Sequence, residues 1–196
     1  ASPVYFPRNP EVGSALVAAV ASANGDDTAG AIHAVYLNAI THARTRLWFT
    51  QAYFAPDRSL REALVAAAAR GVDTRILLPG FSDSPLTLQA SRAVYDELLA
   101  GGVRLFEHDA AFVHAKTALI DDHVAVVGSA NLDFRSLVHN NEVAAIIVDA
   151  DFARGMAATF EEDLRASSEV TPADRAARRW SQLLWEKVAS LFWYWI

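Results

Sequence analysis

The chain has 196 residues, of which 53% are hydrophobic, and its 23 acidic residues outnumber 17 basic ones to give a net charge of −6. This length and composition suit one well-buried domain and exclude a disordered chain, while the acidic balance argues against a broad basic face for long nucleic acids. Because there is no cysteine, disulfides and thiolate metal sites are excluded, and a metal would need His and carboxylate ligands.

The N-terminal run from Leu16 to Asn24 resembles a short signal-peptide core. Glu11 precedes it and Arg8 is the one positive charge nearby, which argues against that interpretation. The sequence begins at Ala1 rather than Met, so we expect a processed product or a piece of a longer protein. No stretch reaches the roughly 18 uninterrupted apolar residues of a membrane-spanning helix.

Helical and strand patterns alternate along the next part of the chain. Asp57 or Ser59 can cap the second helix, with Glu62 completing a capping box. The expected elements, in chain order, are a helix over 28–43, a strand over 46–54, a helix over 57–71, a strand over 72–79, a helix over 85–100 and a strand over 103–108.

Strands that alternate with helices imply crossover connections. This alternation of helices and strands then ends. Residues 112–120 and 123–128 are separated by too few residues for a crossover, so they should form an antiparallel hairpin. Residues 142–148 form a further expected strand, and apolar residues at four-residue spacing over 152–164 mark the last helix of this domain. The predicted fold class is therefore α/β, with a mixed, largely parallel sheet flanked by helices on both faces.

The first strand of the expected hairpin carries two polar residues that suit phosphate chemistry. His114 and Lys116 are two residues apart, so on a strand their side chains project from one face. An imidazole is a nucleophile or proton carrier near neutral pH, and the neighbouring ammonium supplies positive charge for a phosphate. Asp121 falls at the end of this strand, where a carboxylate can accept hydrogen bonds from turn amides.

Polar residues after the second hairpin strand extend this set. Gly128 permits a close backbone approach, Ser129 and Asn131 offer neutral donors, and Glu142 opens the next expected strand. A carboxylate near an imidazole fixes its tautomer and stabilises its protonated form. A purely structural role would explain any one of these residues alone, but their combination predicts a site that holds a phosphoryl group.

The runs HAKTALID, GSANLDFRS and HNNE resemble the signature of the phospholipase D superfamily, in which His, one residue, Lys, four residues and Asp follow in order. The chain is most similar to the C-terminal half of a bacterial cardiolipin synthase, from about Val20 through the terminal LFWYWI. This resemblance implies a phospholipase D-like fold that forms one half of a pseudo-twofold pair, without metal or other cofactor. We expect a catalytic domain over residues 1–170 and a C-terminal amphipathic aromatic helix over residues 171–196.

In that superfamily one His attacks phosphorus to give a phosphohistidine, a second His protonates the leaving alkoxide, and an alcohol or water then takes the phosphoryl group. The resemblance assigns roles to six residues of this chain. His114 would be the nucleophile or general acid/base, and Lys116, Ser129 and Asn131 would be phosphate ligands. Glu142 would orient a His, and Asp121, the carboxylate of the catalytic motif, would have a structural role.

For a cardiolipin synthase type of enzyme, the resemblance implies transfer of a phosphatidyl group from phosphatidylglycerol to a lipid alcohol. The partners would then be phospholipid, an alcohol acceptor and a membrane surface, with a peripheral location on the cytosolic side of the cytoplasmic membrane. No other His in the chain is followed two residues later by Lys. Because one His cannot be both covalent nucleophile and first acid, we expect a second motif from a missing N-terminal half or from a homodimer partner.

Two alternatives to a transferase stay open. The same His114 and Lys116 would serve a phospholipase D-like phosphodiesterase or a homodimeric nuclease. A catalytically inactive half that binds lipid or acts as a scaffold is the other alternative.

Two further segments are open to more than one interpretation. The loop Phe81 to Leu86 either borders the active site or is a plain N-capped turn.

In the C-terminal segment, Thr171 and Asp174 predict a capped helix start. Apolar and aromatic residues then recur beside basic ones: Trp180, Leu183, Leu184, Trp185, Val188, Leu191 and Phe192, with Arg178, Arg179 and Lys187. This helix either docks on protein or inserts into a lipid interface.

Overall fold

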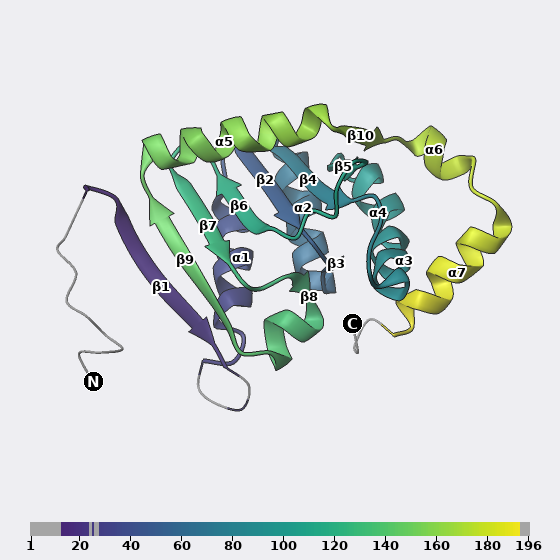
Figure 1. Cartoon of the computed structure of the whole chain (residues 1–196), viewed down its shortest axis with the longest axis horizontal. Helices are drawn as coiled ribbons and strands as arrows, with labels where there is room; N and C mark the ends of the chain where they lie inside the picture. The colour runs from purple at the N-terminus through teal and green to yellow at the C-terminus, as the bar shows by residue number, and fades with distance from the viewer. Residues whose placement is uncertain (1–12, 24, 26–27, 193–196) are drawn as a thin grey trace.

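The computed structural model describes residues 13–23, 25 and 28–192 of the chain. Its centre is an eight-stranded sheet in the order β1-β9-β7-β6-β2-β4-β5-β10 (Figure 1). In that order the strands are β1 Leu16–Ser22, β9 Glu142–Val148, β7 Val124–Gly128, β6 Lys116–Ile120, β2 Arg46–Gln51, β4 Asp73–Pro79, β5 Arg104–His108 and β10 Ser167–Val170. Two short strands, β3 Phe54–Ala55 and β8 Leu132–Asp133, pair separately.

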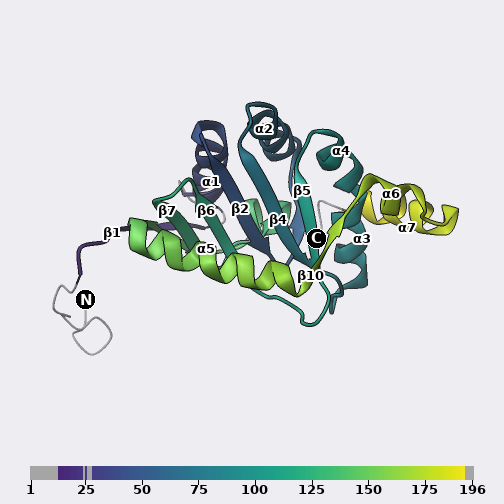
Figure 2. The same ribbon diagram turned by 90° about the horizontal axis from the view of Figure 1, so that it is seen from above.

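Helices cover both faces of the sheet (Figure 2). On one face lies α5 Ala150–Arg165, which packs Ala153 and Phe160 against Trp48, Leu77, Phe106 and Leu119. On the other face lie α1 Ala31–His42, α2 Arg58–Ala69 and α4 Tyr95–Ala100. In α1 the buried residues Ile32, Tyr36 and Ile40 recur every four positions, so one helical stripe supplies this helix's share of the core.

The predicted α/β class with a mixed sheet between helices is confirmed, but the predicted balance of strand directions is corrected. Among the described strands of this sheet, only the β2–β4 and β4–β5 pairings are parallel. The predicted β6–β7 hairpin is present, and β6 inserts antiparallel beside β2. The sheet is therefore mostly antiparallel, because the hairpin and both edge strands run against their neighbours and only the helix-connected strands run in parallel.

Local capping signals explain most helix starts. Asp57 caps α2 by accepting a hydrogen bond from the Leu60 amide at 3.0 Å. Glu62 does not complete a capping box, because it lies beyond the third helical position and pairs instead with Arg58 at 2.6 Å. The helix predicted over residues 85–100 is interrupted at Val94, which separates α3 Pro85–Ala93 from α4.

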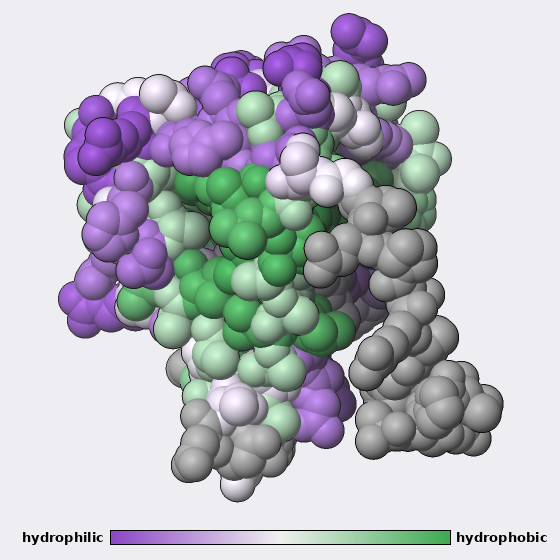
Figure 3. Space-filling view, turned by 90° about the vertical axis from the view of Figure 1, so that its left-hand side faces the viewer, coloured by the Kyte–Doolittle hydropathy of each residue, from purple (hydrophilic) through white to green (hydrophobic). Residues whose placement is uncertain are grey.

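The run that resembles a signal-peptide core forms β1, which lies at one edge of the sheet and pairs with β9. Large apolar side chains stay exposed on β1, β7 and β9: Leu16, Val17, Val127, Val143 and Val148. Hydrophobic residues gather on the side of the molecule seen in Figure 3, so the end of the sheet at β1 presents an apolar surface.

The C-terminal segment differs from the single helix expected over residues 171–196. It forms α6 Pro172–Ala176 and α7 Trp180–Ser190, and the last four residues lie outside the described part of the chain. The predicted cap is present, because the Thr171 amide donates to Asp174 at 2.9 Å and the Asp174 amide donates to Thr171 at 3.2 Å. The turn between the helices lets side chains on both sides of it reach one buried ion-pair cluster. No helix among the described residues is long and apolar enough to cross a membrane.

Also in the described chain is one π-helix, Arg135–His139, which follows β8 and precedes β9. It places the Ser136 hydroxyl within hydrogen-bond distance of Asn131 and Glu142, two of the residues that the sequence singled out.

Candidate active site

His114 and Lys116 lie together at the start of β6. Lys116 is the first residue of the strand and only 9% exposed, whereas His114 lies in the extended segment before it and is exposed. The Lys116 Nζ is 3.1 Å from Nδ1 and 3.2 Å from Nε2 of His114, and it donates to the His114 carbonyl oxygen at 3.3 Å. The structure therefore brings the two side chains together, although the strand begins four residues later than expected.

An aromatic wall borders the imidazole of His114. The ring of Phe112 lies 5.4 Å from it, and Tyr53 approaches edge-on at 5.8 Å. Phe81 extends this wall by packing 6.5 Å from Phe112, so the loop over 81–86 borders the site. Ser84 of the same loop also caps α3, which means that both interpretations of this segment hold.

Tyr53 ties this wall to the loop through its hydroxyl group, which donates to Asp83 at 2.7 Å. Burial, the hydrogen bond to Asp83 and the charge of that carboxylate raise the pKa of Tyr53 to about 12. Tyr53 therefore stays a neutral hydrogen-bond donor across the physiological range and holds the loop against the imidazole.

Glu142, at the start of β9, gathers hydroxyl and amide donors. Its carboxylate accepts hydrogen bonds from Ser136 at 2.9 Å, from Asn140 at 3.2 Å and from the hydroxyl of Ser129. The sequence predicts that Glu142 orients an imidazole, but within the described chain His114 is not among these hydrogen-bond partners. Because Ser129 gives its proton to Glu142 and accepts the Val143 amide at 3.0 Å, it must exchange a partner before it can donate to a phosphate.

Gly128 permits the close approach that places Ser129 beside β9. A Cβ atom at Gly128 would lie 2.6 Å from the carbonyl oxygen of Val143 and 2.9 Å from the Cα of Ala144. Both neighbours are backbone atoms of β9, which cannot move aside without disturbing the sheet. The glycine therefore positions the end of β7 at the site.

Asn131 is buried between the site and the π-helix. Its Oδ1 accepts a hydrogen bond from the Tyr53 amide at 3.4 Å, and its Nδ2 donates to Ser136 at 3.4 Å. Both contacts are long, so the Asn131 amide can shift toward a ligand at little cost. Asn131 also lines a cavity of about 350 Å³ together with Tyr53, Asp133, Arg135 and Asn140.

Two buried polar residues of the site were given no role by sequence reasoning. Gln51, at the end of β2, pairs in register with Lys116, and its Oε1 accepts a hydrogen bond from the Leu132 amide at 3.1 Å. Its buried Nε2 has no hydrogen-bond partner among the residues that the structure describes. A polar residue at a buried position of an apolar strand was the signal that could have identified Gln51.

Asp133 is the second such residue. Burial and the nearby charge of Glu142 raise its pKa to about 6, against the opposing effects of the Ser136 amide, Arg135 and Lys116. Burial also lowers the pKa of Lys116, while Glu142 and Asp133 counteract that effect. The floor of the site therefore contains one cation and two carboxyl groups whose charges depend on each other.

Asp121 lies at the opposite end of β6 from the His114–Lys116 pair, about 13–17 Å away at the usual rise of a strand. Its Oδ1 accepts hydrogen bonds from the amides of Arg44, Thr45 and Arg46 and from the Thr45 hydroxyl, at 2.8 to 3.3 Å. Burial raises the pKa of Asp121, but these donors outweigh it and hold the pKa below its ordinary value. This carboxylate fastens the hairpin turn to the start of β2.

The arrangement has a clear chemical capacity. An exposed imidazole is held by aromatic rings beside an ammonium group, above a floor of amide and hydroxyl groups. Such a set suits nucleophilic attack on, or proton transfer to, a group that carries a phosphoryl charge. Among the described residues, no group of three or more His, Asp or Glu side chains is arranged to hold a metal ion.

Comparison with known proteins places this geometry in a family. The model of the family described as "Cardiolipin synthase, PLD-like domain" matches residues 36–164. The probable cardiolipin synthase YwiE of Bacillus subtilis is 37% identical over 170 residues, and cardiolipin synthase A of Pseudomonas aeruginosa is 38% identical over 191 residues. These alignments cover 87% and 96% of this chain but 34% and 38% of the relatives, so the chain spans about a third of their length.

Solved structures agree at the level of the fold. Nuc from Salmonella typhimurium, described as a phospholipase D family member, has a TM-score of 0.68 at 21% identity and aligns over 81% of this chain and 99% of its own. The phosphatidylserine synthase of Haemophilus influenzae has a TM-score of 0.70 at 12% identity, over 91% of this chain and 45% of its own. The phospholipase D-like fold is thus confirmed, and the family match shows that the chain belongs to the cardiolipin synthase family of phospholipase D-like domains.

Proposed function

We propose that this chain is a phosphatidyltransferase lobe of the cardiolipin synthase type. The observation that carries the proposal is the His114–Lys116 pair, whose polar atoms lie 3.1–3.2 Å apart inside a domain matched by the cardiolipin synthase family model. The substrate would be phosphatidylglycerol, and the acceptor a lipid alcohol such as a second phosphatidylglycerol.

In the proposed reaction His114 attacks the phosphorus of phosphatidylglycerol. A bond forms between the imidazole nitrogen and phosphorus, the phosphorus–oxygen bond to glycerol breaks, and the leaving alkoxide takes a proton from a second His. The hydroxyl group of the acceptor lipid then attacks the phosphohistidine, gives its proton back to the second His and releases His114. Splitting the transfer lets glycerol leave before the lipid alcohol arrives.

Lys116 is suited to stabilise the charge on the phosphoryl oxygens during both steps. Its ammonium group is held next to the imidazole, and the carboxylates of Glu142 and Asp133 favour its charged form. The amide of Asn131 and the hydroxyl of Ser129 are further phosphate ligands in this proposal, and the Ser129 hydroxyl would turn its hydrogen bond from Glu142 to the phosphate.

The second His must come from outside the motif described here, because the sequence contains one such motif. We infer that a second lobe supplies it. The relatives are about three times as long as the matched region, which leaves room for a second lobe on the same polypeptide.

The decisive experiment is an assay of the chain joined to a second lobe that carries its own His and Lys motif. Phosphatidylglycerol in detergent micelles should yield cardiolipin and free glycerol in equal amounts. His114→Ala should abolish both products, and acid-quenched wild type should contain phosphohistidine. The matched control is His123→Ala, since His123 is exposed in the hairpin turn at the far end of β6. If His114→Ala retained turnover, the proposed function would fail.

A phosphodiesterase that works as a homodimer is the second candidate. It is favoured by the alignment of this lobe with 99% of the chain in the solved structure of Nuc, a phospholipase D family member. Light scattering on the chain alone, followed by assay of phosphatidic acid release from phosphatidylglycerol, separates the candidates. A dimer that hydrolyses the lipid would favour the phosphodiesterase. A monomer without turnover that gains transfer activity from a second lobe would favour the transferase, and the absence of turnover in both forms would favour an inactive half.

A further inference from the structure

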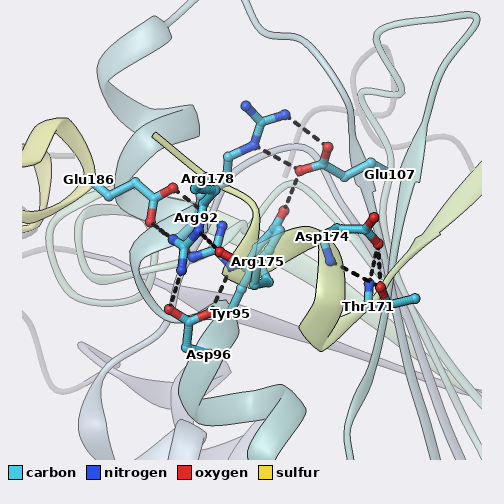
Figure 4. Close-up of polar contacts among 9 residues, drawn as sticks. All are labelled: Arg92, Tyr95, Asp96, Glu107, Thr171, Asp174, Arg175, Arg178 and Glu186. Atoms are coloured by element: carbon cyan, nitrogen blue, oxygen red, sulfur yellow. Dashed lines mark hydrogen bonds and ion pairs between the residues drawn. The ribbon is translucent and has the colours of Figure 1, made fainter. Parts of the chain in front are cut away.

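Helix α7 is attached to the domain by its charged side. Glu186 is buried, only 4% exposed, and accepts a hydrogen bond from Arg175 at 2.9 Å. It also pairs with Arg178, and both arginines bind Asp96 on α4, at 2.8 and 2.6 Å (Figure 4). Arg175 further donates to the carbonyl oxygen of Arg92 at 2.6 Å, so the cluster joins α3, α4, α6 and α7.

The opposite side of α7 is therefore turned outward, although it is the apolar side. Glu186 and Ala189 face the domain, whereas Trp180, Leu184 and Leu191 recur at helical spacing on the far side. These three side chains are 77%, 54% and 77% exposed. A helix on a water-exposed surface normally buries its apolar stripe, and α7 does the reverse.

The charges on this outward stripe have one sign. Between Trp180 and Phe192 the single acidic residue is Glu186, which faces inward and is neutralised by two arginines. Lys187 is exposed next to Trp180 on the helical wheel, and Arg179 is exposed at the start of the helix. The stripe is thus apolar and cationic on a chain whose net charge is −6.

We propose that the outward stripe of α7, formed by Trp180, Leu184, Lys187 and Leu191, binds the interface of an anionic lipid bilayer. Tryptophan side chains prefer the headgroup region, leucines enter the acyl boundary, and a lysine can extend its ammonium group to anionic headgroups. A protein partner fits less well, because lysine is depleted in the buried centre of protein interfaces. The proposal goes beyond the proposed function and does not depend on it, since it concerns binding alone.

Vesicle flotation tests the proposal on the whole chain. Vesicles with equal parts phosphatidylglycerol and phosphatidylcholine should carry the protein, and vesicles of phosphatidylcholine alone should carry less. Trp180→Ser combined with Leu184→Ser should lower the partition coefficient at least about tenfold, because two large apolar side chains no longer enter the interface. Lys187→Glu should weaken binding to the anionic vesicles more than to the neutral ones.

Two controls keep the result specific. Phe152→Ser removes an exposed apolar side chain from α5, and His123→Ala changes an exposed residue of the turn between β6 and β7; both should bind vesicles as the wild type does. The serine substitutions lie at exposed positions, so an unchanged urea midpoint should confirm folding. If either variant failed to fold, quenching of tryptophan emission by brominated lipid, reduced in Trp180→Phe, would give the same answer.

The proposal is overturned by any of three results. The wild type could fail to bind anionic vesicles, or the double serine variant could bind them as tightly as the wild type. Light scattering could also show that the wild type self-associates and that the double serine variant is monomeric, in which case the stripe is a protein interface.

Discussion

The ammonium of Lys116 lies 3.1 Å from Nδ1 and 3.2 Å from Nε2 of His114, which is within reach of either ring nitrogen. A charged amine at this place can donate one hydrogen bond to the imidazole and another to an oxygen of a bound phosphoryl group. It therefore links the orientation of the nucleophile to the stabilisation of the transferring group.

Replacement of Lys116 tests this link. Lys116→Met should lower kcat for phosphatidyl transfer by about 10²–10³, the usual effect of losing one donor to a developing charge. Lys116→Arg keeps the charge and should retain more activity than Lys116→Met, with a geometry less suited to a single phosphoryl oxygen. Turnover of phosphatidylglycerol by Lys116→Met at the wild-type rate would contradict the role in charge stabilisation.

Asp121 should matter for stability rather than for chemistry. Asp121→Ala leaves the amides of Arg44, Thr45 and Arg46 without their acceptor, so the free energy of unfolding should fall by about 1–3 kcal/mol while the folded protein keeps its kcat. Because the folded state lowers the pKa of Asp121, this stabilisation is present above the unfolded pKa and is lost as pH falls through the folded one. Urea denaturation measures both effects.

Asp122→Ala is the matched control for Asp121, because its carboxylate is 70% exposed and pairs only with Arg46 at 3.3 Å. Its free energy of unfolding should lie within about 0.5 kcal/mol of the wild-type value. Equal effects of the two substitutions would show that the amide contacts of Asp121 do not stabilise the hairpin.

Asp133 should make stability depend on pH in the opposite direction. Its pKa in the folded protein is about 6, above the ordinary 3.8, so the folded state binds more protons than the unfolded state between these values. The free energy of unfolding should therefore fall as pH rises from about 4 to about 6 and then level off. Asp133→Asn keeps an acceptor for the Ser136 amide and stays neutral, so its free energy of unfolding should exceed that of the wild type by about 3 kcal/mol at neutral pH.

Urea denaturation from pH 4 to pH 7 checks this prediction. The difference between Asp133→Asn and the wild type should grow with pH. Parallel stability curves for the two proteins would mean that Asp133 does not titrate in this window.

Gly128→Ala should separate β7 from β9. The added Cβ would lie 2.6 Å from the Val143 carbonyl oxygen, so the free energy of unfolding should drop by about 1–3 kcal/mol, and Ser129 should move away from Glu142. Gly155→Ala is the matched control, because nothing lies within 4 Å of its added Cβ in the middle of α5. It should raise the free energy of unfolding by about 0.5–1 kcal/mol. If both variants were less stable than the wild type, the close approach of β9 would not be the reason for the effect at Gly128.

Much of the fold could be predicted because the signals are local. The β6–β7 hairpin follows from two apolar runs with a very short connection, and the Thr171–Asp174 cap follows from two side chains three residues apart. The prediction of a largely parallel sheet was wrong because strand order depends on distant residues. The insertion of β6 between β7 and β2 requires pairings with residues about 70 positions away in the chain.

The candidate site likewise contains residues that the sequence identifies and others that only the folded chain reveals. The sequence identifies five residues of the site from their spacing: His114, Lys116, Ser129, Asn131 and Glu142. The structure gathers them around the start of β6, the end of β7 and the start of β9. Gln51 could not be named, because its role depends on a hydrogen bond to Leu132, 81 residues away. The sequence places Glu142 at the site but does not identify its hydrogen-bond partners. Whether it binds an imidazole or the donors of Ser129, Ser136 and Asn140 depends on side-chain geometry in the folded chain.

The sequence by itself determined the family motif, the hairpin that carries it, the capped helix starts and the apolar, cationic composition of the C-terminal segment, since each depends on residues close together in the chain. Only the tertiary structure decided that Asp121 accepts hydrogen bonds from the amides of residues 44–46, that Asp133 is buried close to Lys116, and that α7 presents its apolar side outward. The physical reason is that burial and ion pairing depend on which distant segments meet: Arg175 on α6 and Asp96 on α4 are 79 residues apart, and their pairing helps set which side of α7 faces water.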